Sequence, residues 1–471
     1  MTVDGARLDR HLESLRRERS AALGRVERQG ETDPDIRRDR AVALGRVERQ
    51  GEPDPDIRRA IAAIVAAGEP FGTPQPVWAD AGTVDPASLA RRLADAVDGD
   101  AVETTHGWYV RRELRPVYLP IDRARLATLP GMPGPATPLF CLDTETTGLG
   151  SAAGTVAFLI GIGWWQGDRM RLVQLLLPDL SEEGALLDAL AAEVPAGACL
   201  VTYNGRSFDW PLLETRFRMG RRLPPAIDGH LDLLLLVRRL FRHRLPDARL
   251  QTVERHLLRR HRAPDIPSWE IPAAYHSFLR GGSAAPIRVV ARHNVEDVVT
   301  LGRILAHIER GYGEGEVRRW APAGDLVRLA RLFRHEARFD EAVACLEIAS
   351  GPLDGADPEV ALATMELARL LRRCGRDAEA GVAWSRLATA PGPLAGMAWI
   401  ELSKEREHRQ RDLAGAWAAT DQALLALYRS RGHGNAMQRR ALEADLARRR
   451  ARLARRLERA GFGGATHQPA P

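Results

Sequence analysis

The amino-acid sequence predicts an α/β domain, in which helices flank a mixed sheet, followed by an all-α domain of helical repeats. Two observations carry this prediction: apolar runs alternate with helical patterns in the middle of the chain, and the pattern is almost wholly helical after about residue 320. Three runs come first and are typical of strands, and a helix, a strand and a further helix follow. The strands are expected at 139–143, 155–165, 170–178 and 198–204, and the helices at 181–194 and from 209.

The helical part of the chain repeats itself loosely. Ala342, Ala380 and Ala416 occupy matching places, spaced 38 and 36 residues apart. Paired helices with a small residue at the close-packed position, at such a period, are typical of tetratricopeptide-like repeats. An ordinary helical bundle is the alternative. The segment from 437 predicts a long basic helix that ends the domain.

Changes in composition divide the chain into five parts. The stretch 22–38 recurs almost unchanged at 43–59, and two copies of so polar a unit cannot bury a shared core, so we expect partial disorder there. A Pro- and Gly-rich stretch at 130–138 suggests a boundary. The predicted parts are a charged duplicated segment (1–65), a small mixed segment with a linker (66–137), the α/β domain (138–312), the helical domain (322–460) and a flexible tail (461–471).

Composition points to a cytoplasmic protein. Apolar residues make up 45% of the chain, but no run of about 18 of them predicts a membrane span. The N-terminus lacks the apolar core of a secretory signal. The four cysteines lie far apart, which favours thiols that pack in the core over disulfides or a metal site.

Charge hints at an anionic partner. The net charge is +6, and residues 216–262 hold thirteen arginines against four acids. A basic rim beside an active site would follow a phosphate backbone. The alternative is a solvated helix face in a protein whose codon usage favours arginine.

Four carboxylates are the candidate functional residues. Asp143 and Glu145 stand two apart in "FCLDTETTGLG", and a strand places residues i and i+2 on one face. Asp209 begins a helix in "YNGRSFDWPLL". Asp297 lies in a helix in "ARHNVEDVVTL", with His293 one turn earlier on the same face.

Converging carboxylates repel one another unless cations lie among them. Hard oxygen ligands suit Mg²⁺ or Mn²⁺, and a pair of such ions can support in-line phosphoryl displacement. A nearby imidazole can orient the attacking water or accept its proton. The sequence thus holds the parts of a two-metal phosphodiesterase.

The stretches "LDTETTGL", "YNGRSFD" and "HNVEDVVTL" resemble the three exonuclease motifs of the DEDD superfamily, which has a ribonuclease H-like fold. Residues from about 138 to 310 resemble the YprB-type ribonuclease H-like domain more closely. The resemblance implies a ribonuclease H-like mixed sheet and a 3′–5′ exonuclease, a hydrolase that acts on single-stranded 3′ ends with two divalent cations.

The resemblance also assigns the site. It implies that Asp143, Glu145, Asp209 and Asp297 bind the metals and that His293 is the general base. His293 precedes Asp297 by four residues. This is the spacing of the DEDD branch that uses tyrosine, whereas five residues are usual in the branch that uses histidine as the base.

Five further residues are candidates for substrate contact. Thr146, Thr147 and Gly148 could bring backbone close to the terminal nucleotide, although a simple turn explains them equally well. Asn204 and Phe208 match the second motif, where we expect them to shape the turn and pack the helix rather than do chemistry.

Two alternatives remain open for the function. The chain could be a non-catalytic nucleic-acid-binding scaffold, with the repeats as a protein-interaction surface. It could also be a structure-specific endonuclease that uses the same metals. No short motif distinguishes RNA from DNA, since that choice depends on contacts to the 2′-hydroxyl.

Overall fold

The computed structural model describes residues 85–148, 154–262, 266–353, 357–391, 394–429 and 436–460. All of them belong to one compact unit, Asp80–Pro471. The duplicated segment 1–65 and the tail 461–471, for which disorder and flexibility are predicted, lie outside the described residues.

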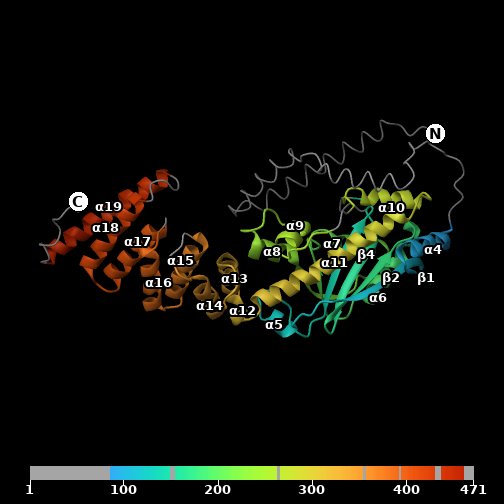
Figure 1. The fold of residues 1–471 in the computed structure, drawn as a ribbon, viewed down its shortest axis with the longest axis horizontal. Helices are drawn as coiled ribbons and strands as arrows, with labels where there is room; N and C mark the ends of the chain where they lie inside the picture. The colour runs from blue at the N-terminus through green and yellow to red at the C-terminus, as the bar shows by residue number, and fades with distance from the viewer. Residues whose placement is uncertain are drawn as a thin grey trace, which may run out of the picture. The chain divides into compact units, whose positions relative to one another are not determined.

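A single seven-stranded mixed sheet organises the first part of this unit (Figure 1), in the order β1-β2-β5-β4-β3-β6-β7. β3, β6 and β7 are parallel, and all other neighbours are antiparallel. The fold class predicted from the sequence is therefore confirmed. The strands are β1 (Asp100–Thr104), β2 (Gly107–Tyr118), β3 (Leu139–Thr146), β4 (Ala157–Gln166), β5 (Arg169–Leu176), β6 (Ala198–Thr202) and β7 (Ile227–Asp232).

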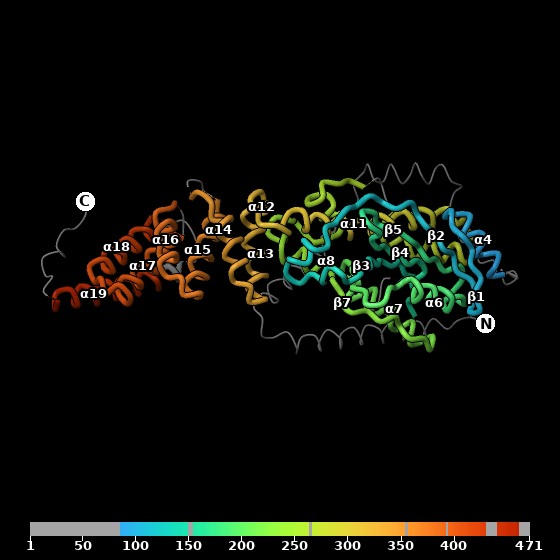
Figure 2. Tube along the Cα trace, turned by 90° about the horizontal axis from the view of Figure 1, so that it is seen from below, coloured from blue at the N-terminus to red at the C-terminus, as the bar shows by residue number. Residues whose placement is uncertain are grey.

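Helices flank both faces of this sheet. Figure 2 shows α6 and α7 on one side of β3–β5 and α11 on the other. The helices of this part are α4 (Pro86–Val97), α5 (Arg123–Ala127), α6 (Glu183–Glu193, preceded by a 3₁₀ turn at Leu180–Glu182), α7 (Asp209–Met219), α8 (Leu233–Phe241), α9 (Leu250–His256), α10 (Ile271–Leu279) and α11 (Ala285–Tyr312).

The alternation of β3 divides its apolar residues between two cores. Leu139 and Cys141 belong to one cluster, with Met170 of β5 and much of α8 and α11. Phe140 and Leu142 belong to the other, together with residues of α4, α6, α7, α10 and the first turns of α11. Asp143 and Glu145 follow Leu139 and Cys141 in the period-two pattern, so they continue the α11 face of the sheet.

A close approach of α11 to the sheet depends on a glycine. Gly161 of β4 is the register partner of Asp143, and a Cβ added at Gly161 would lie 2.0 Å from Asn294 Oδ1. The absent side chain lets the polar edge of α11 reach the strand that bears the acids.

Among the described residues beyond Tyr312, every regular element is a helix, as predicted. Ala342, Ala380 and Ala416 are fully buried in the second helices of successive pairs, α13–α14, α15–α16 and α17–α18. The tetratricopeptide-like assignment itself stays a prediction. These helices are α12 (Gly315–Arg318), α13 (Ala323–His335), α14 (Phe339–Ala349), α15 (Pro358–Arg373), α16 (Asp377–Thr389), α17 (Leu394–His408), α18 (Leu413–Arg429) and α19 (Ala436–Arg459).

Three cysteines behave as expected and one does not. Cys141, Cys199 and Cys345 are buried thiols, whereas Cys374 is exposed. The prediction of core packing is wrong for Cys374 because this residue caps the C-terminus of α15. Among the helices of the described residues, none combines the length and apolar character that crossing a bilayer requires.

We expect Gly161→Ala to lower the free energy of unfolding by about 1–3 kcal/mol, because its methyl group would displace the Asn294 amide from a filled core. Urea denaturation followed by circular dichroism measures this loss. The matched control is Gly154→Ala, where an added Cβ meets nothing within 4 Å. Equal stability of the two variants would contradict the close approach of α11.

Candidate active site

The strand that carries Asp143 is held to α11 by buried amides. Asn294 Nδ2 donates to Asp143 Oδ2 at 2.9 Å, and Gln174 Nε2 donates to Asn294 Oδ1 at 2.8 Å. Asn294 and Gln174 are almost fully buried, so these bonds have no competition from water. The orientation of the Asp143 carboxylate is therefore fixed by the packing of α11 on β3 and β5.

Asp209, at the start of α7, is hydrogen-bonded to β3, the strand that carries Asp143. It is the first residue of α7, and its Oδ1 accepts hydrogen bonds from Thr144 Oγ1 at 2.5 Å and Thr144 N at 3.2 Å. Thr144 lies between Asp143 and Glu145, so β3 contributes both acids and the anchor for a third.

The loop before Asp209 holds two residues named in the sequence prediction, Asn204 and Phe208. Asn204 has a φ of 68°, and its N–H donates to Asp232 Oδ1 at 2.8 Å. Asp232 ends β7 and also caps α8 through Leu234 N, so its role is structural. Phe208 is 52% exposed. The expectation that Phe208 packs the helix is wrong, because this residue stands at the N-cap of α7 and is largely exposed.

His293 and Asp297 of α11 lie side by side, as the i, i+4 spacing predicts. His293 Nε2 is 3.5 Å from Asp297 Oδ2 and 3.8 Å from Glu145 Oε1. The imidazole is 7% exposed, so its ring is held at the edge of the acid cluster. Glu296, next to Asp297, points elsewhere and pairs with Arg303 at 3.2 Å.

The candidate turn at Thr146–Gly148 is fixed by internal bonds. Thr146 Oγ1 donates to Gly148 O at 2.7 Å, and Thr147 N donates to Val156 O at 2.9 Å. Thr147 O also lies 3.2 Å from His276 Nε2. The backbone groups of Thr147 thus already have protein partners, and a contact with a nucleotide here stays a prediction.

An arginine that the sequence prediction did not assign lies beside the cluster. Arg262 donates to both oxygens of Glu254, at 2.6 and 2.7 Å, and to Asp297 Oδ1. Glu254 is 3% exposed and also accepts from Thr300 Oγ1. No local motif marks Arg262 or Glu254. Asn294 does lie inside the quoted third motif, next to His293.

Burial and mutual repulsion dominate the electrostatics of the cluster. Burial raises the pKa of Asp143 well above its usual range, and the negative charges of Asp297, Asp209 and Glu145 raise it further. Burial also raises the pKa of Asp209, against the opposing Thr144 hydrogen bonds, and that of Asp297, against His293 and Arg262. Asp143 thus senses all three other acids.

Carboxylate oxygens are the ligands that hard divalent cations prefer. In this structure, three of the acids accept hydrogen bonds from protein groups instead. In the part of the chain that the structure describes, no three His, Cys, Asp or Glu side chains form a group arranged to hold a metal ion. Asp143 accepts from Asn294, Asp209 from Thr144 and Asp297 from Arg262. The acids offer only oxygen donors, the type of ligand that Mg²⁺ and Mn²⁺ prefer.

Comparison with known proteins assigns the family. A model of the RNase_H superfamily matches residues 140–309, the segment that holds the four predicted metal-binding acids and His293. This segment is therefore a domain of that superfamily, whose domains are generally nucleases.

A curated relative extends the match beyond that domain. The chain is 32% identical over 324 residues to "Uncharacterized protein YprB" of Bacillus subtilis (strain 168). The match covers 68% of this chain and 77% of YprB.

We expect Arg262→Met to destabilise the fold by about 3 kcal/mol, because it leaves Glu254 as a buried, unpaired charge. The double variant Arg262→Met/Glu254→Gln should recover most of this loss in urea denaturation. Arg218→Met is the control, since Arg218 and Glu214 form a more exposed pair worth less than about 1 kcal/mol. Equal losses for Arg262→Met and Arg218→Met would contradict a buried ion pair.

Proposed function

We propose that the protein is a metal-dependent 3′–5′ exonuclease that hydrolyses phosphodiester bonds of nucleic acid by a two-metal mechanism. The observation that carries the proposal is that four acids from three elements, β3, α7 and α11, lie close enough for their charges to interact. Such a cluster is unfavourable in a folded protein unless it has a cationic ligand. The family supports nuclease chemistry, and the 3′–5′ polarity rests on the resemblance to DEDD exonucleases.

In this proposal Asp143, Glu145, Asp209 and Asp297 would hold two Mg²⁺ or Mn²⁺ ions, with Asp143 assigned to both. Bound ions would lower the pKa of the attacking water and neutralise the leaving oxygen. Asn294 and Thr144 position two of the acids, so their hydrogen bonds would have to persist or exchange when the ions enter.

His293 is assigned as the general base. Its Nε2 lies 3.8 Å from Glu145 Oε1 and 3.5 Å from Asp297 Oδ2, which supports the proposal that it would take the proton of a water held between these acids. The two carboxylates stabilise the imidazolium that forms after proton transfer. Phe208 is assigned to stack on a base near the chain end, because its exposed ring stands directly before Asp209.

A non-catalytic scaffold is the second candidate, and one observation favours it. Arg262 already neutralises Asp297, so part of the cluster has a partner without metal. In a scaffold, this pairing would be the permanent state of the site. In an exonuclease, Arg262 would share Asp297 with the ions or turn wholly to Glu254.

We expect the purified chain with Mn²⁺ to shorten 5′-labelled single-stranded oligonucleotides from the 3′ end, and Asp143→Asn to slow this by about a thousandfold or more. Denaturing gels over time measure the shortening, with RNA and DNA tested in parallel. The matched control is Glu296→Gln, an equal change of charge on α11 that leaves the cluster intact.

Three outcomes separate the candidates. Full activity of Asp143→Asn would overturn the site assignment. No divalent-dependent turnover, together with no Mn²⁺ binding in calorimetry, would favour the scaffold. Cleavage of a circular single-stranded substrate would identify an endonuclease.

A further inference from the structure

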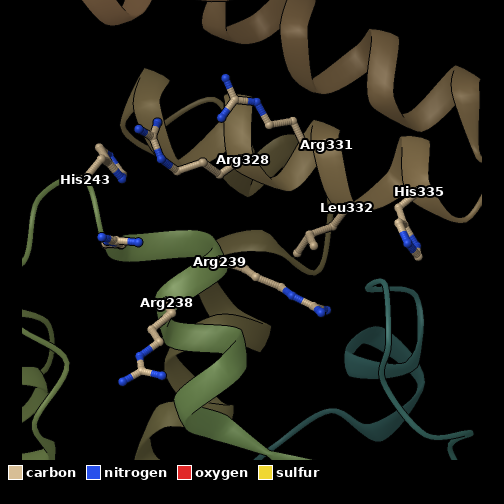
Figure 3. A pocket seen from close by; sticks show the side chains of 8 residues that line it. Arg238, Arg239, His243, Arg328, Arg331, Leu332 and His335 are labelled. Carbon is tan, nitrogen blue, oxygen red and sulfur yellow. The ribbon is translucent and has the colours of Figure 1, made fainter. Parts of the chain in front are cut away.

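A basic cleft lies where the α/β domain meets the helical domain. It has a volume of about 600 Å³ and lies between α8, with the turn after it, and α13 (Figure 3). We name it the α8–α13 cleft. Five arginines line it, Arg238, Arg239, Arg242, Arg328 and Arg331, and none of the described residues that line it is acidic.

The positive charge of the cleft is only partly neutralised by its surroundings. Arg328 pairs with Glu359 at 3.2 Å, and Arg331 pairs with Glu366, both acids coming from α15. Arg238 and Arg239 are exposed, and neither has an acidic partner among the described residues. The excess charge therefore comes from α8, the helix that directly follows the last strand of the sheet.

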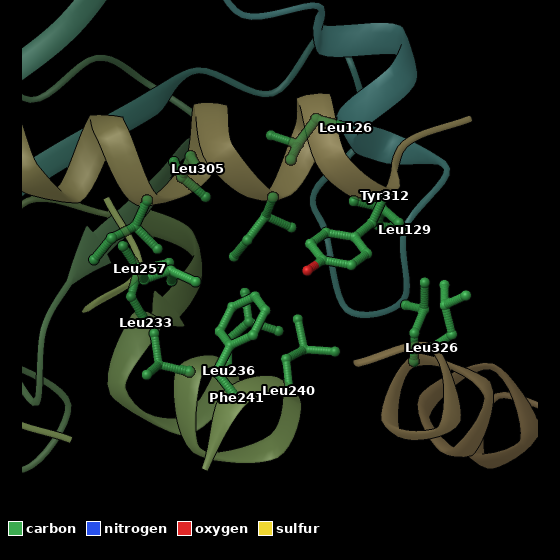
Figure 4. Packing of buried hydrophobic residues seen from close by; sticks show 14 of the residues in the cluster. Leu126, Leu129, Leu233, Leu236, Leu240, Phe241, Leu257, Leu305, Tyr312 and Leu326 are labelled. Carbon is green, nitrogen blue, oxygen red and sulfur yellow. The ribbon is translucent and has the colours of Figure 1, made fainter. Parts of the chain in front are cut away.

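The walls of the cleft are fixed to each other. Asp325 at the start of α13 is fully buried and accepts from Arg244 Nε at 2.9 Å, Arg244 Nη2 at 2.8 Å and Tyr312 Oη at 2.6 Å. Leu240 and Phe241 of α8 share one apolar core with Leu326 of α13 (Figure 4). Because the two helices are already ordered, a ligand would lose little affinity to reorganisation of the walls.

The cleft is connected to the acid cluster through a few residues. Asp232 caps α8 and binds the backbone N–H groups of Asn204 and Arg206, in the loop that leads to Asp209. From Leu233 to Arg239 the axis of α8 rises by about 9 Å. α8 thus leads from the loop that precedes Asp209 to the cleft, and a strand that follows α8 would pass from the acids to the cleft.

We propose that the α8–α13 cleft binds the phosphate backbone of a nucleic-acid strand, a few nucleotides away from the end that lies at the acids. Planar guanidinium groups bind phosphate with paired hydrogen bonds, and grooves that follow single strands are built from such positive charge. The spread of five arginines over two helices suits an extended polyanion better than one small anion. The choice of ligand rests on the proposed function, whereas the cleft and its charge do not.

The test is binding without cleavage. Fluorescence anisotropy with the full chain in EDTA measures the affinity for labelled 20-nucleotide single strands of RNA and of DNA, at several salt concentrations. We expect the double variant Arg238→Gln/Arg239→Gln to bind the RNA strand, the DNA strand or both about tenfold more weakly. The slope of log K against log salt concentration should be smaller in magnitude by about 1.4. Binding of a 6-nucleotide strand should change little. The matched control is Arg91→Gln/Arg115→Gln, which removes the same charge from exposed sites that do not line the cleft.

Two results would overturn the inference. One is an affinity and salt slope of the cleft variant equal to those of the control. The other comes from a parallel titration with inorganic triphosphate: if the cleft variant loses affinity for triphosphate and for neither 20-nucleotide strand, the cleft is a small-anion site. Because no hydrolysis occurs in EDTA, the proposed function can fail separately: weaker binding by the cleft variant, with no manganese-dependent cleavage by the wild type, would keep the cleft and reject the exonuclease.

Discussion

The site depends on one contact, the buried amide of Asn294 between Gln174 and Asp143. It joins the middle of α11 to two strands of the sheet, and Gly161 leaves the space that it needs. Together with the apolar residues of α11 that pack on the strands, this contact sets the register of α11 on the sheet. His293 and Asp297 take their position relative to the acids of β3 from this register, because they reach the cluster only through the placement of α11.

Several buried carboxylates of this chain are paired with arginine. Glu254 has Arg262, Asp325 has Arg244, and Glu407 of α17 has Arg449, Arg452 and Arg456 of α19. Each acid is almost fully buried. The pairs of Asp325 and Glu407 join elements that are distant in sequence, and Arg262, which lies eight residues from Glu254, also reaches the distant Asp297. The guanidinium group suits this purpose since it remains charged and offers several donors in one plane. An abundance of arginine is therefore partly structural, and only its surplus, as in the α8–α13 cleft, points to a ligand.

Local pattern was enough to predict the central strands and most of the acids. Apolar runs bounded by turn residues predicted β3, β4, β5 and β6, and the i, i+4 spacing predicted that His293 and Asp297 share a face. Such local patterns did not predict which strands from distant segments pair with each other. β1 and β2 come from the segment 66–137, yet β2 extends the sheet through β5, because strand pairing depends on edges that meet only in the folded chain.

By itself, the sequence determined the four acids and the histidine, at spacings that place Asp143 with Glu145 on one face of a strand and His293 with Asp297 on one face of a helix. It also determined the repeating helical pattern that follows them in the chain. Only the tertiary structure decided how these groups are satisfied. It brought Arg262 and Glu254 beside Asp297, exposed Phe208 and opened a basic cleft between α8 and α13. The physical reason is that period and spacing are properties of one element, whereas the burial of a charge and the choice of its partner depend on elements that pack together from far apart in the chain.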